Sequence, residues 1–300
     1  MSQTDRPLLG IALMLGFCLM APLGDAMAKI LGTSISVAQI LLVRFAVQGI
    51  VLVPICWITG RSLRLAPRVH RLAWVRVVLH VVGIGAMFTA LIYLPLAEAI
   101  AIAFVMPFIL LLMGKVFLNE DVGIRRLAAC GVGFIGTLFV IQPSFAEVGA
   151  FAMLPLVVAV VFALFMVVTR SIAKEVDPIA LQGLNGFMAL AILVPLLLWG
   201  HSSGIAGASW RAPDMASWTL LIAVGVLGTI AHLFMTWSLR FAPSTTLAPM
   251  QYLEIPFATI IGWLVFQDLP NGLAAVGIAI TMAAGLYVIL RERQTNAVQP

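Results

Sequence analysis

The chain has 300 residues, of which 62% are hydrophobic and only 10% are charged, and its mean hydropathy is +1.12. Soluble domains are about half apolar and about a quarter charged, so the composition excludes a soluble protein and predicts a polytopic membrane protein. The formal net charge is +5, but the basic residues gather in short links between apolar runs. That distribution is an insertion signal, and no nucleic-acid partner is expected.

The bilayer core is about 30 Å thick and needs roughly 20 apolar residues per helix. Cutting the chain at charges, Pro/Gly pairs and polar clusters predicts ten spans, at 8–31, 36–58, 72–94, 96–118, 124–141, 149–171, 178–200, 216–239, 244–267 and 272–291. Arg6 and the Ala26-Met27-Ala28 triplet give the first span the look of a signal peptide. The first span has a repeat partner in the sixth, so we expect it to stay in the mature protein.

The segment 104–136 matches the segment 253–285, which lies 149 residues further along, without a gap. The coincident pairs are Pro107 with Pro256, Phe108 with Phe257, Phe117 with Phe266, Gly123 with Gly272 and Gly136 with Gly285. These residues bend helices or form turns, so the match indicates an internal duplication. Five spans per half is an odd number, so the second half enters the membrane from the opposite side. The predicted fold is all-α, with ten transmembrane helices in two inverted five-helix repeats, residues 1–145 and 146–300.

Orientation follows from the basic residues, which concentrate on the cytoplasmic side of membrane proteins. With a cytoplasmic N-terminus, that side receives fourteen of the lysines and arginines. The other side receives only Lys29 and Arg211, and Arg44 falls inside the second span. The count predicts a multi-pass protein of the cell (inner) membrane with both termini in the cytoplasm.

The APLGDAMAK end of the first span, the VRF of the second, and the Asn-Glu-Asp run followed by Gly after the fourth resemble the EamA-type carriers of the drug/metabolite transporter superfamily. The resemblance covers the whole chain. In length and topology the chain is similar to the YddG-type exporters of aromatic and other neutral amino acids. The family carries a Gly-Glu pair after spans four and nine, whereas this chain has Asn119-Glu120 and Gln267-Asp268.

Two prolines suggest where a substrate cavity lies. Proline cannot donate to the carbonyl four residues earlier, so Pro107 frees the carbonyl of Ala103 and Pro256 frees that of Tyr252. Free backbone groups at membrane depth are tolerated only against protein or water. We therefore expect helix kinks at both prolines and a cavity between spans four and nine, with spans one, three, six and eight around it.

Ionisable residues inside the membrane are costly and normally face a cavity or a partner. Glu254 and Gln251 share a helix face, and both are candidate substrate-binding residues. Alternatively, Glu254 pairs structurally with Arg44 or a histidine. Asp25 and Lys29 are one turn apart and are expected to pair. That pair is either a plain interfacial ion pair or part of the outer gate.

His80 and His232 are further candidates, because histidine titrates near neutral pH and could relay protons or contact substrate. The alternative for each is a hydrogen-bonded packing role. Aromatic and thioether side chains commonly line apolar ligand pockets. The candidates of this kind are Tyr252, Trp237, Phe165, Met20 and Met87, with lipid-facing or interhelical packing as their alternative.

The resemblance implies a secondary transporter that exports small zwitterionic metabolites, above all neutral or aromatic amino acids, by alternating access through a central cavity. The alternative cargo is a hydrophobic cation, a drug or another small metabolite. We expect no cofactor and no metal: Cys18, Cys56 and Cys130 lie in apolar runs, and no phosphate-binding G-x-x-x-x-G-K-[ST] loop occurs. An enzyme is not expected, since Asp25 lacks the second intramembrane aspartate of a membrane protease. The partners are a small-molecule substrate and the lipid bilayer, and two self-contained halves favour a monomer.

Overall fold

The computed structural model describes residues 6–141, 149–268 and 272–297, and this part of the chain is all-helical, without a strand. The α-helices are α1 (Pro7–Leu31), α2 (Val37–Ile58), α3 (Pro67–Tyr93), α4 (Leu96–Ala103), α5 (Met106–Leu118), α6 (Ile124–Ile141), α8 (Leu154–Ile172), α9 (Pro178–Ser202), α10 (Met215–Phe241), α11 (Ser244–Leu247), α12 (Glu254–Phe266) and α13 (Gly272–Ala297). Three 3₁₀ segments complete them: η1 (Gly149–Met153), η2 (Ala206–Ala208) and η3 (Ala248–Leu253).

Seven stretches of the described chain are long and apolar enough to cross a membrane, and the protein is a multi-pass membrane protein. They are α1, α2, α3, Leu96–Leu118, Gly149–Ile172, α9 and α10. Helices also occupy the other three predicted spans, as α6, as α11 to α12, and as α13. The all-helical class is confirmed, whereas the count of ten membrane spans stays a prediction.

Polar side chains in the loops start several of these helices. Ser36 accepts a hydrogen bond from the backbone of Gln39 at the start of α2, and Asp177 accepts two at the start of α9. Asp214 accepts from the Ser217 backbone N–H at the start of α10, and this hydrogen bond lowers the pKa of the exposed Asp214 carboxyl. Each cap satisfies backbone donors that have no partner inside the helix.

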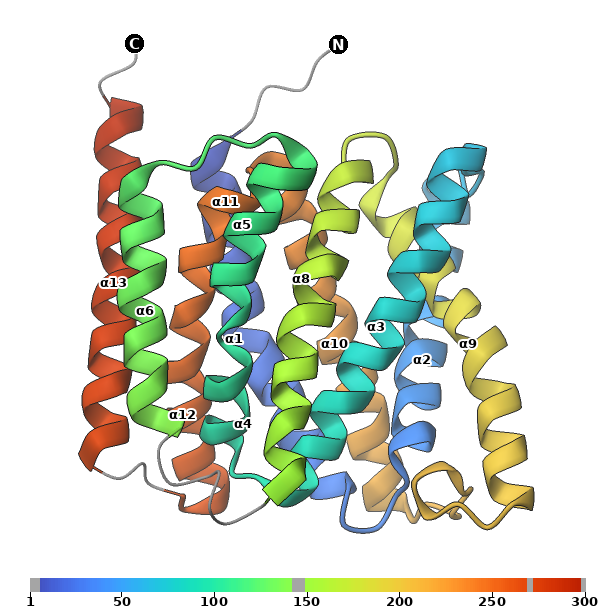
Figure 1. Ribbon diagram of the computed structural model, residues 1–300. Coiled ribbons are helices and arrows are strands. Elements are labelled where there is room, and N and C mark those ends of the chain that lie inside the picture. Colours follow the sequence, from blue (N-terminus) through green and yellow to red (C-terminus); the bar gives the residue numbers. More distant parts are fainter. Residues whose placement is uncertain (1–5, 142–148, 269–271, 298–300) are drawn as a thin grey trace.

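The helices stand side by side, with α13 and α6 at one edge and α2 and α9 toward the other (Figure 1). The start of α1 and the end of α13, the helices next to the two termini, lie at the same end of the bundle. The main packed pairs are α1 with α10, α3 with α8, α2 with α9 and α6 with α13. If each helix of one repeat is replaced by its counterpart in the other, the pair α1–α10 becomes the pair α8–α3. The pairs α2–α9 and α6–α13 stay the same. The packing has the pattern expected of an inverted duplication, while the boundaries 1–145 and 146–300 stay a prediction.

Two central helices are interrupted where the sequence places its prolines. The helix of Leu96–Leu118 is broken at Phe104 and Val105, so that α4 ends and α5 begins one residue before Pro107. In the matching segment, η3 leads into α12 two residues before Pro256. Both α5 and α12 have 13 residues and end at a left-handed residue, Asn119 (φ 50°) and Gln267 (φ 59°). Irregular backbone therefore lies at the middle of the bundle.

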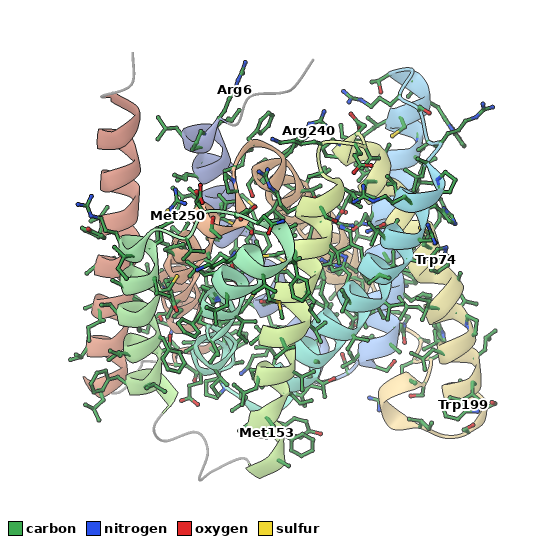
Figure 2. The ribbon with its side chains drawn as sticks, turned by 45° about the horizontal axis from the view of Figure 1, so that its top comes forward. Arg6, Trp74, Met153, Trp199, Arg240 and Met250 are labelled. Carbon is green, nitrogen blue, oxygen red and sulfur yellow. The ribbon has the colours of Figure 1, made fainter. Side chains whose placement is uncertain are left out.

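Close packing holds the periphery together. A Cβ atom at Gly186 in α9 would lie 2.6 Å from the backbone nitrogen of Gly49 in α2, so the two backbones touch there. Large side chains such as Trp74 and Trp199 lie at the outer surface, whereas Met250 is fully buried (Figure 2). An apolar outer surface is what a lipid environment requires.

Candidate substrate-binding site

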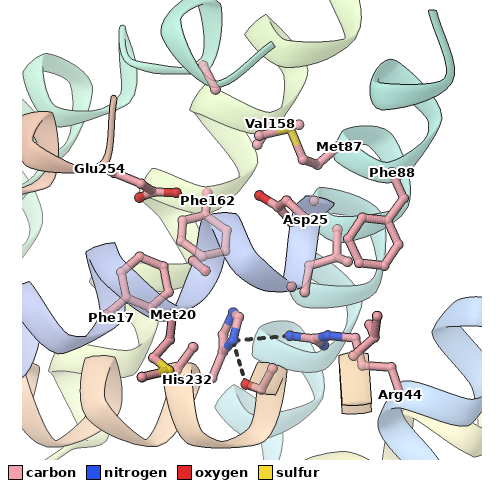
Figure 3. Close-up of a pocket in the computed structure, with 18 of the residues that line it drawn as sticks. Phe17, Met20, Asp25, Arg44, Met87, Phe88, Val158, Phe162, His232 and Glu254 are labelled. Atoms are coloured by element: carbon pink, nitrogen blue, oxygen red, sulfur yellow. Dashed lines mark hydrogen bonds between the residues drawn. The ribbon is translucent and has the colours of Figure 1, made fainter. Parts of the chain in front are cut away.

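A cavity of about 90 Å³ lies in the middle of the bundle. Residues of α1, α3, the α4–α5 junction, α8, α10 and α12 line it, which are the helices expected from the sequence, and α2 adds Arg44. Its apolar wall includes the aromatic residues Phe17, Phe88, Phe104 and Phe162. Its polar groups are the side chains of Asp25, Arg44, His232 and Glu254 (Figure 3).

Five of the candidates chosen from the sequence line this cavity: Met20, Asp25, Met87, His232 and Glu254. They come from α1, α3, α10 and α12, which are far apart in the sequence. Glu254 opens α12 directly after η3, so the break before Pro256 delivers its carboxyl group to the cavity wall.

Tyr252 and Gln251 lie outside the cavity lining. The hydroxyl of Tyr252 donates to the carbonyl oxygen of Cys130 at 3.0 Å, and a Cβ atom at Gly133 would lie 2.5 Å from the Tyr252 ring. Gln251 directs its amide nitrogen to the sulfur of Met166 at 3.1 Å. These side chains pack η3 against α6 and α8. Tyr252 therefore has the interhelical packing role that was the alternative for it in the sequence.

His80, Phe165 and Trp237 also lie outside the lining. The His80 ring lies behind the cavity wall, 4.4 Å between centroids from His232 and 4.6 Å from Phe165. Trp237 is half-buried on α10. His80 and Phe165 can therefore act on the cavity only through His232 and its neighbours.

The predicted ion pair between Asp25 and Lys29 does not form in the described part of the chain. The ammonium of Lys29 donates instead to the carbonyl oxygen of Leu94 at 2.6 Å and lies 5.3 Å from the Phe266 ring centroid. The reason is that Leu94 directly follows the last residue of α3, where carbonyl groups lack helical partners. Asp25 is left facing the cavity.

Glu254 has no structural partner of the kind considered as its alternative. Among the described residues, neither Glu254 nor Asp25 forms a hydrogen bond or an ion pair, although the charges of Asp25 and Arg44 interact at longer range. Arg44 directs its Nη2 atom to Nδ1 of His232, 3.1 Å away. In the sequence, Arg44 was expected only as a partner for Glu254, although its place near the middle of the apolar span 36–58 was a signal for a role at the cavity.

A second buried arginine lies deeper in the bundle. Arg76, counted with the cytoplasmic residues in the sequence analysis, is fully buried and donates to Thr169 at 2.8 Å, Gln182 at 2.8 Å and Thr236 at 3.2 Å. Its guanidinium also lies 4.5 Å from the Phe165 ring centroid. These contacts join α3 to α8, α9 and α10 through neutral acceptors alone.

Polar contacts join helices at both ends of the bundle. At the end that carries the termini, the carboxylate of Glu120 accepts from Arg170, from the Ser244 backbone and hydroxyl, and from the Thr245 backbone, at 2.7 to 3.3 Å. Arg170 also donates to the carbonyl of Leu239 at 2.6 Å. We name these residues the terminus-side cluster, and we name Lys29, Leu94 and Phe266 at the opposite end the far-side cluster.

The arrangement is suited to binding a solute that carries both charge signs and an apolar or aromatic part. Phenylalanine rings supply apolar contact, a guanidinium can meet an anion, and two unpaired carboxyl groups can meet a cation. No cluster of potential metal ligands occurs within the described residues.

Comparison with known proteins places the chain in a family. The model of the EamA-like transporter family matches residues 8–142 and again 149–291. A solved structure shares its fold at a TM-score of 0.72 and 18% identity, covering 96% of this chain and 98% of the other.

Three relatives have named cargoes. A riboflavin transporter of Brucella anthropi is 30% identical over 223 residues, 74% of this chain and 77% of the relative. An S-adenosylmethionine uptake transporter of Rickettsia felis is 24% identical over 272 residues, 90% and 88% of the two chains. A pseudopaline exporter of Pseudomonas aeruginosa is 27% identical over 218 residues, 72% and 71%. None of these three names specifies neutral or aromatic amino acids. The family model matches both halves, and the chain belongs to the EamA-like transporter family as a membrane transporter, not an enzyme.

Proposed function

We propose that this transporter carries small zwitterionic solutes with an apolar or aromatic part, and that neutral and aromatic amino acids are exported through it. The observation that supports this proposal is the composition of the cavity lining, in which Arg44 and the unpaired carboxyl groups of Asp25 and Glu254 lie among phenylalanine side chains. A zwitterion can satisfy both signs of charge at once, which an anion or a cation alone cannot. This combination supports the zwitterion over the hydrophobic cation considered as its alternative.

Alternating access is supported by the size of the cavity. Its volume of about 90 Å³ is below the roughly 300–1,000 Å³ of pockets that hold drug-sized ligands. A bound solute therefore requires a wider state, which a rearrangement of the two repeats about the cavity would supply.

The two end clusters support the same mechanism. In the repeat, Lys29 corresponds to Arg170, which lies 141 residues further along. Lys29 donates to the carbonyl of Leu94, which directly follows α3, and Arg170 donates to that of Leu239 in the last turn of α10. Helix α3 corresponds to α10 in the repeat. The negative charges of Asp268 and Glu98 act on Lys29, and the carboxylate of Glu120 accepts a hydrogen bond from Arg170 at 3.3 Å. Opening the cavity to one side requires breaking one cluster while the other persists.

We propose the cell (inner) membrane as the location, with both termini in the cytoplasm and a single copy as the transporting unit. Arg6 and Arg240 lie at the end of the bundle that carries the termini (Figure 2). There the exposed Arg61 of the α2–α3 link and Arg68 at the start of α3 pair with Asp177 and Glu175 of the α8–α9 link. Basic loops of this kind support a cytoplasmic side.

A second candidate is a cationic zwitterion of the S-adenosylmethionine type. The cavity offers two carboxyl groups, Asp25 and Glu254, for one guanidinium, Arg44. A solute with an amino acid group, an additional positive charge and an aromatic ring would use both carboxyl groups. The Rickettsia relative named for uptake of that compound supports including it.

The test is counterflow in proteoliposomes loaded with unlabelled solute and challenged with labelled L-phenylalanine, S-adenosylmethionine, riboflavin or a lipophilic cation at equal pH on both sides. Accumulation of L-phenylalanine or S-adenosylmethionine is the expected result. Accumulation of riboflavin or the lipophilic cation alone would refute a zwitterion carrier.

Matched variants connect the result to the cavity. Glu254→Gln removes a carboxylate at the cavity wall and is expected to reduce counterflow at least about tenfold, since hydrogen bonds to charged groups contribute about 1.5–3 kcal/mol. Glu175→Gln removes a carboxylate at the surface and is expected to leave it unchanged. Equal activity of both variants would contradict a role for Glu254 in binding.

A further inference from the structure

A second hollow lies at the surface of the bundle, at the same end as the terminus-side cluster. Its volume is about 250 Å³, and the α2–α3 link, the start of α3 and the α8–α9 link form its walls. Its polar groups are Arg61, Ser62, Arg64, Glu175 and Asp177, and the rest of its lining is apolar. It shares no lining residue with the central cavity, so it is a separate feature of the molecule.

Both carboxylates of this hollow are already occupied. Arg61 pairs with Oδ2 of Asp177, and Arg68 pairs with Glu175. The other carboxylate oxygen of Asp177 accepts hydrogen bonds from two backbone N–H groups at the start of α9. These contacts hold the α2–α3 link against the α8–α9 link and fix the walls of the hollow. Its described lining therefore contains no free carboxylate that could meet a cation.

Guanidinium donors, in contrast, remain available. Residues 61–71 contain four arginines and no acidic residue. Arg64 lines the hollow, and neither its side chain nor that of Arg71 forms a hydrogen bond or ion pair with a described residue. Arg61 uses Nη1 for its ion pair and Nε for Thr59, so its Nη2 atom also remains. Four guanidinium groups against two carboxylates leave an excess of positive charge, which favours an anion.

Aromatic side chains place this hollow at the boundary between lipid tails and headgroups. Trp57 in the last turn of α2 is 70% exposed, and Trp74 lies on the outer surface of α3, three residues after Arg71 (Figure 2). The indole nitrogen of Trp74 donates to Nε2 of His70 at 3.3 Å, so its polar edge faces the start of α3. Tryptophan is enriched at bilayer interfaces, where its ring sits at the level of the headgroups. The free arginines therefore lie where lipid phosphates are found.

We propose that this hollow binds the phosphate of an anionic phospholipid of the surrounding membrane. Arg61 and Arg64 donate to the phosphate oxygens, to which the guanidinium group is well matched. The acyl chains lie along α2 and α3, beside Trp57 and Trp74. Basic segments next to a membrane span attract anionic lipids, whereas the ammonium group of a zwitterionic lipid would find both carboxylates of the hollow already paired. This site is independent of the cargo that the central cavity carries.

Calorimetric titration of the purified full-length protein in detergent tests the site with three probes. Dioctanoyl-phosphatidylglycerol has a phosphate, a net negative charge and acyl chains, dioctanoyl-phosphatidylcholine adds a cation, and glycerol 3-phosphate lacks the chains. The heat of mixing with protein-free micelles is subtracted. We expect phosphatidylglycerol to bind at least about tenfold more tightly than either of the other probes.

Two matched variants connect the binding to the hollow. Arg64→Gln is expected to weaken phosphatidylglycerol about fivefold. Arg64 makes no side-chain contact with a described residue, so this variant is expected to keep the wild-type melting temperature without lipid. Arg125→Gln removes an exposed arginine at the start of α6, at the same end of the bundle, and is expected to leave the affinity unchanged (Figure 1).

Equal affinity for phosphatidylcholine would overturn the selectivity for an anionic lipid. Equal affinity for glycerol 3-phosphate would show a site for soluble phosphates and overturn the lipid assignment. Equal weakening by Arg64→Gln and Arg125→Gln, or by neither, would show that the hollow does not hold the phosphate. Counterflow takes no part in this test, so its outcome leaves the proposed function untouched.

Discussion

Replacing Glu120 with glutamine is expected to open the end of the transporter that carries the termini. The carboxylate is only 9% exposed and accepts four hydrogen bonds, two on each oxygen, from Arg170, Ser244 and Thr245. Glutamine keeps one acceptor oxygen and places an amide group against donors. Glu120 belongs to the proposed first repeat and its three partners to the second, so the substitution weakens a contact between repeats.

The size of the effect follows from these contacts. A hydrogen bond to a charged group contributes about 1.5–3 kcal/mol, and water in the open state replaces part of the loss. A net change of about 2 kcal/mol would shift the equilibrium roughly thirtyfold toward the state open at this end. Because the far-side cluster of Lys29, Leu94 and Phe266 is untouched, the opposite end is expected to stay closed.

Thiol labelling measures this shift. In a protein whose three buried cysteines have been replaced, Ala231→Cys places one thiol at the cavity wall. Glu120→Gln is expected to accelerate labelling by a membrane-impermeant maleimide at least about tenfold from the terminus side, in line with the population shift. Labelling from the other side is expected to slow.

Glu175→Gln, which removes an exposed carboxylate paired with Arg68, is the control and is expected to change neither rate. Unchanged labelling in Glu120→Gln from both sides would refute the gating role of the terminus-side cluster.

Three further predictions concern single side chains. Gly228→Ala places a Cβ atom 2.6 Å from Nε of Arg44; the long side chain can move away, so we expect a folded protein whose counterflow of L-phenylalanine falls about tenfold. Gly186→Ala meets the backbone of α2, which cannot move so easily, and is expected to cost about 1–3 kcal/mol and lower the melting temperature, whereas Gly131→Ala has open space and is the control. The lowered pKa of Asp214 means that its cap stabilises the folded state above the ordinary value of 3.8 and is lost as pH falls through the lower folded-state value. Asp214→Ala is therefore expected to lower the melting temperature at pH 7 more than at pH 3; equal losses at both would contradict the cap.

Much of the helical layout could be predicted, because charges and prolines mark helix ends in an apolar chain. The predicted spans 8–31 and 36–58 correspond to Pro7–Leu31 and Val37–Ile58. The third helix begins at Pro67 and not at 72, since a helix can continue past the bilayer with Arg68 and Arg71 in water. Cutting at charges cannot detect such an extension.

The helices around the cavity were predicted better than the side chains that reach it. The matched prolines located the irregular backbone, but the segment before Pro256 is a 3₁₀ helix that advances about 120° per residue. Gln251 and Tyr252 therefore point away from the directions that an α-helical reading gives. The role of Arg44 depends on Gly228, 184 residues away in the sequence and on another helix. Nothing in a local pattern could reveal that contact.

The hydrogen bonds of Arg76 have a consequence for which parts of the protein can move as rigid bodies. Arg76 lies in the proposed first repeat, yet Thr169, Gln182 and Thr236 all belong to the second. Separating α3 from α8, α9 and α10 would break the hydrogen bonds of the buried Arg76 guanidinium, each of which contributes about 1.5–3 kcal/mol. We therefore expect these four helices, which come from both proposed repeats, to move together when the cavity widens. The expected hinges then lie inside the repeats, at the extended residues Leu94 and Ala242 that precede Pro95 and Pro243.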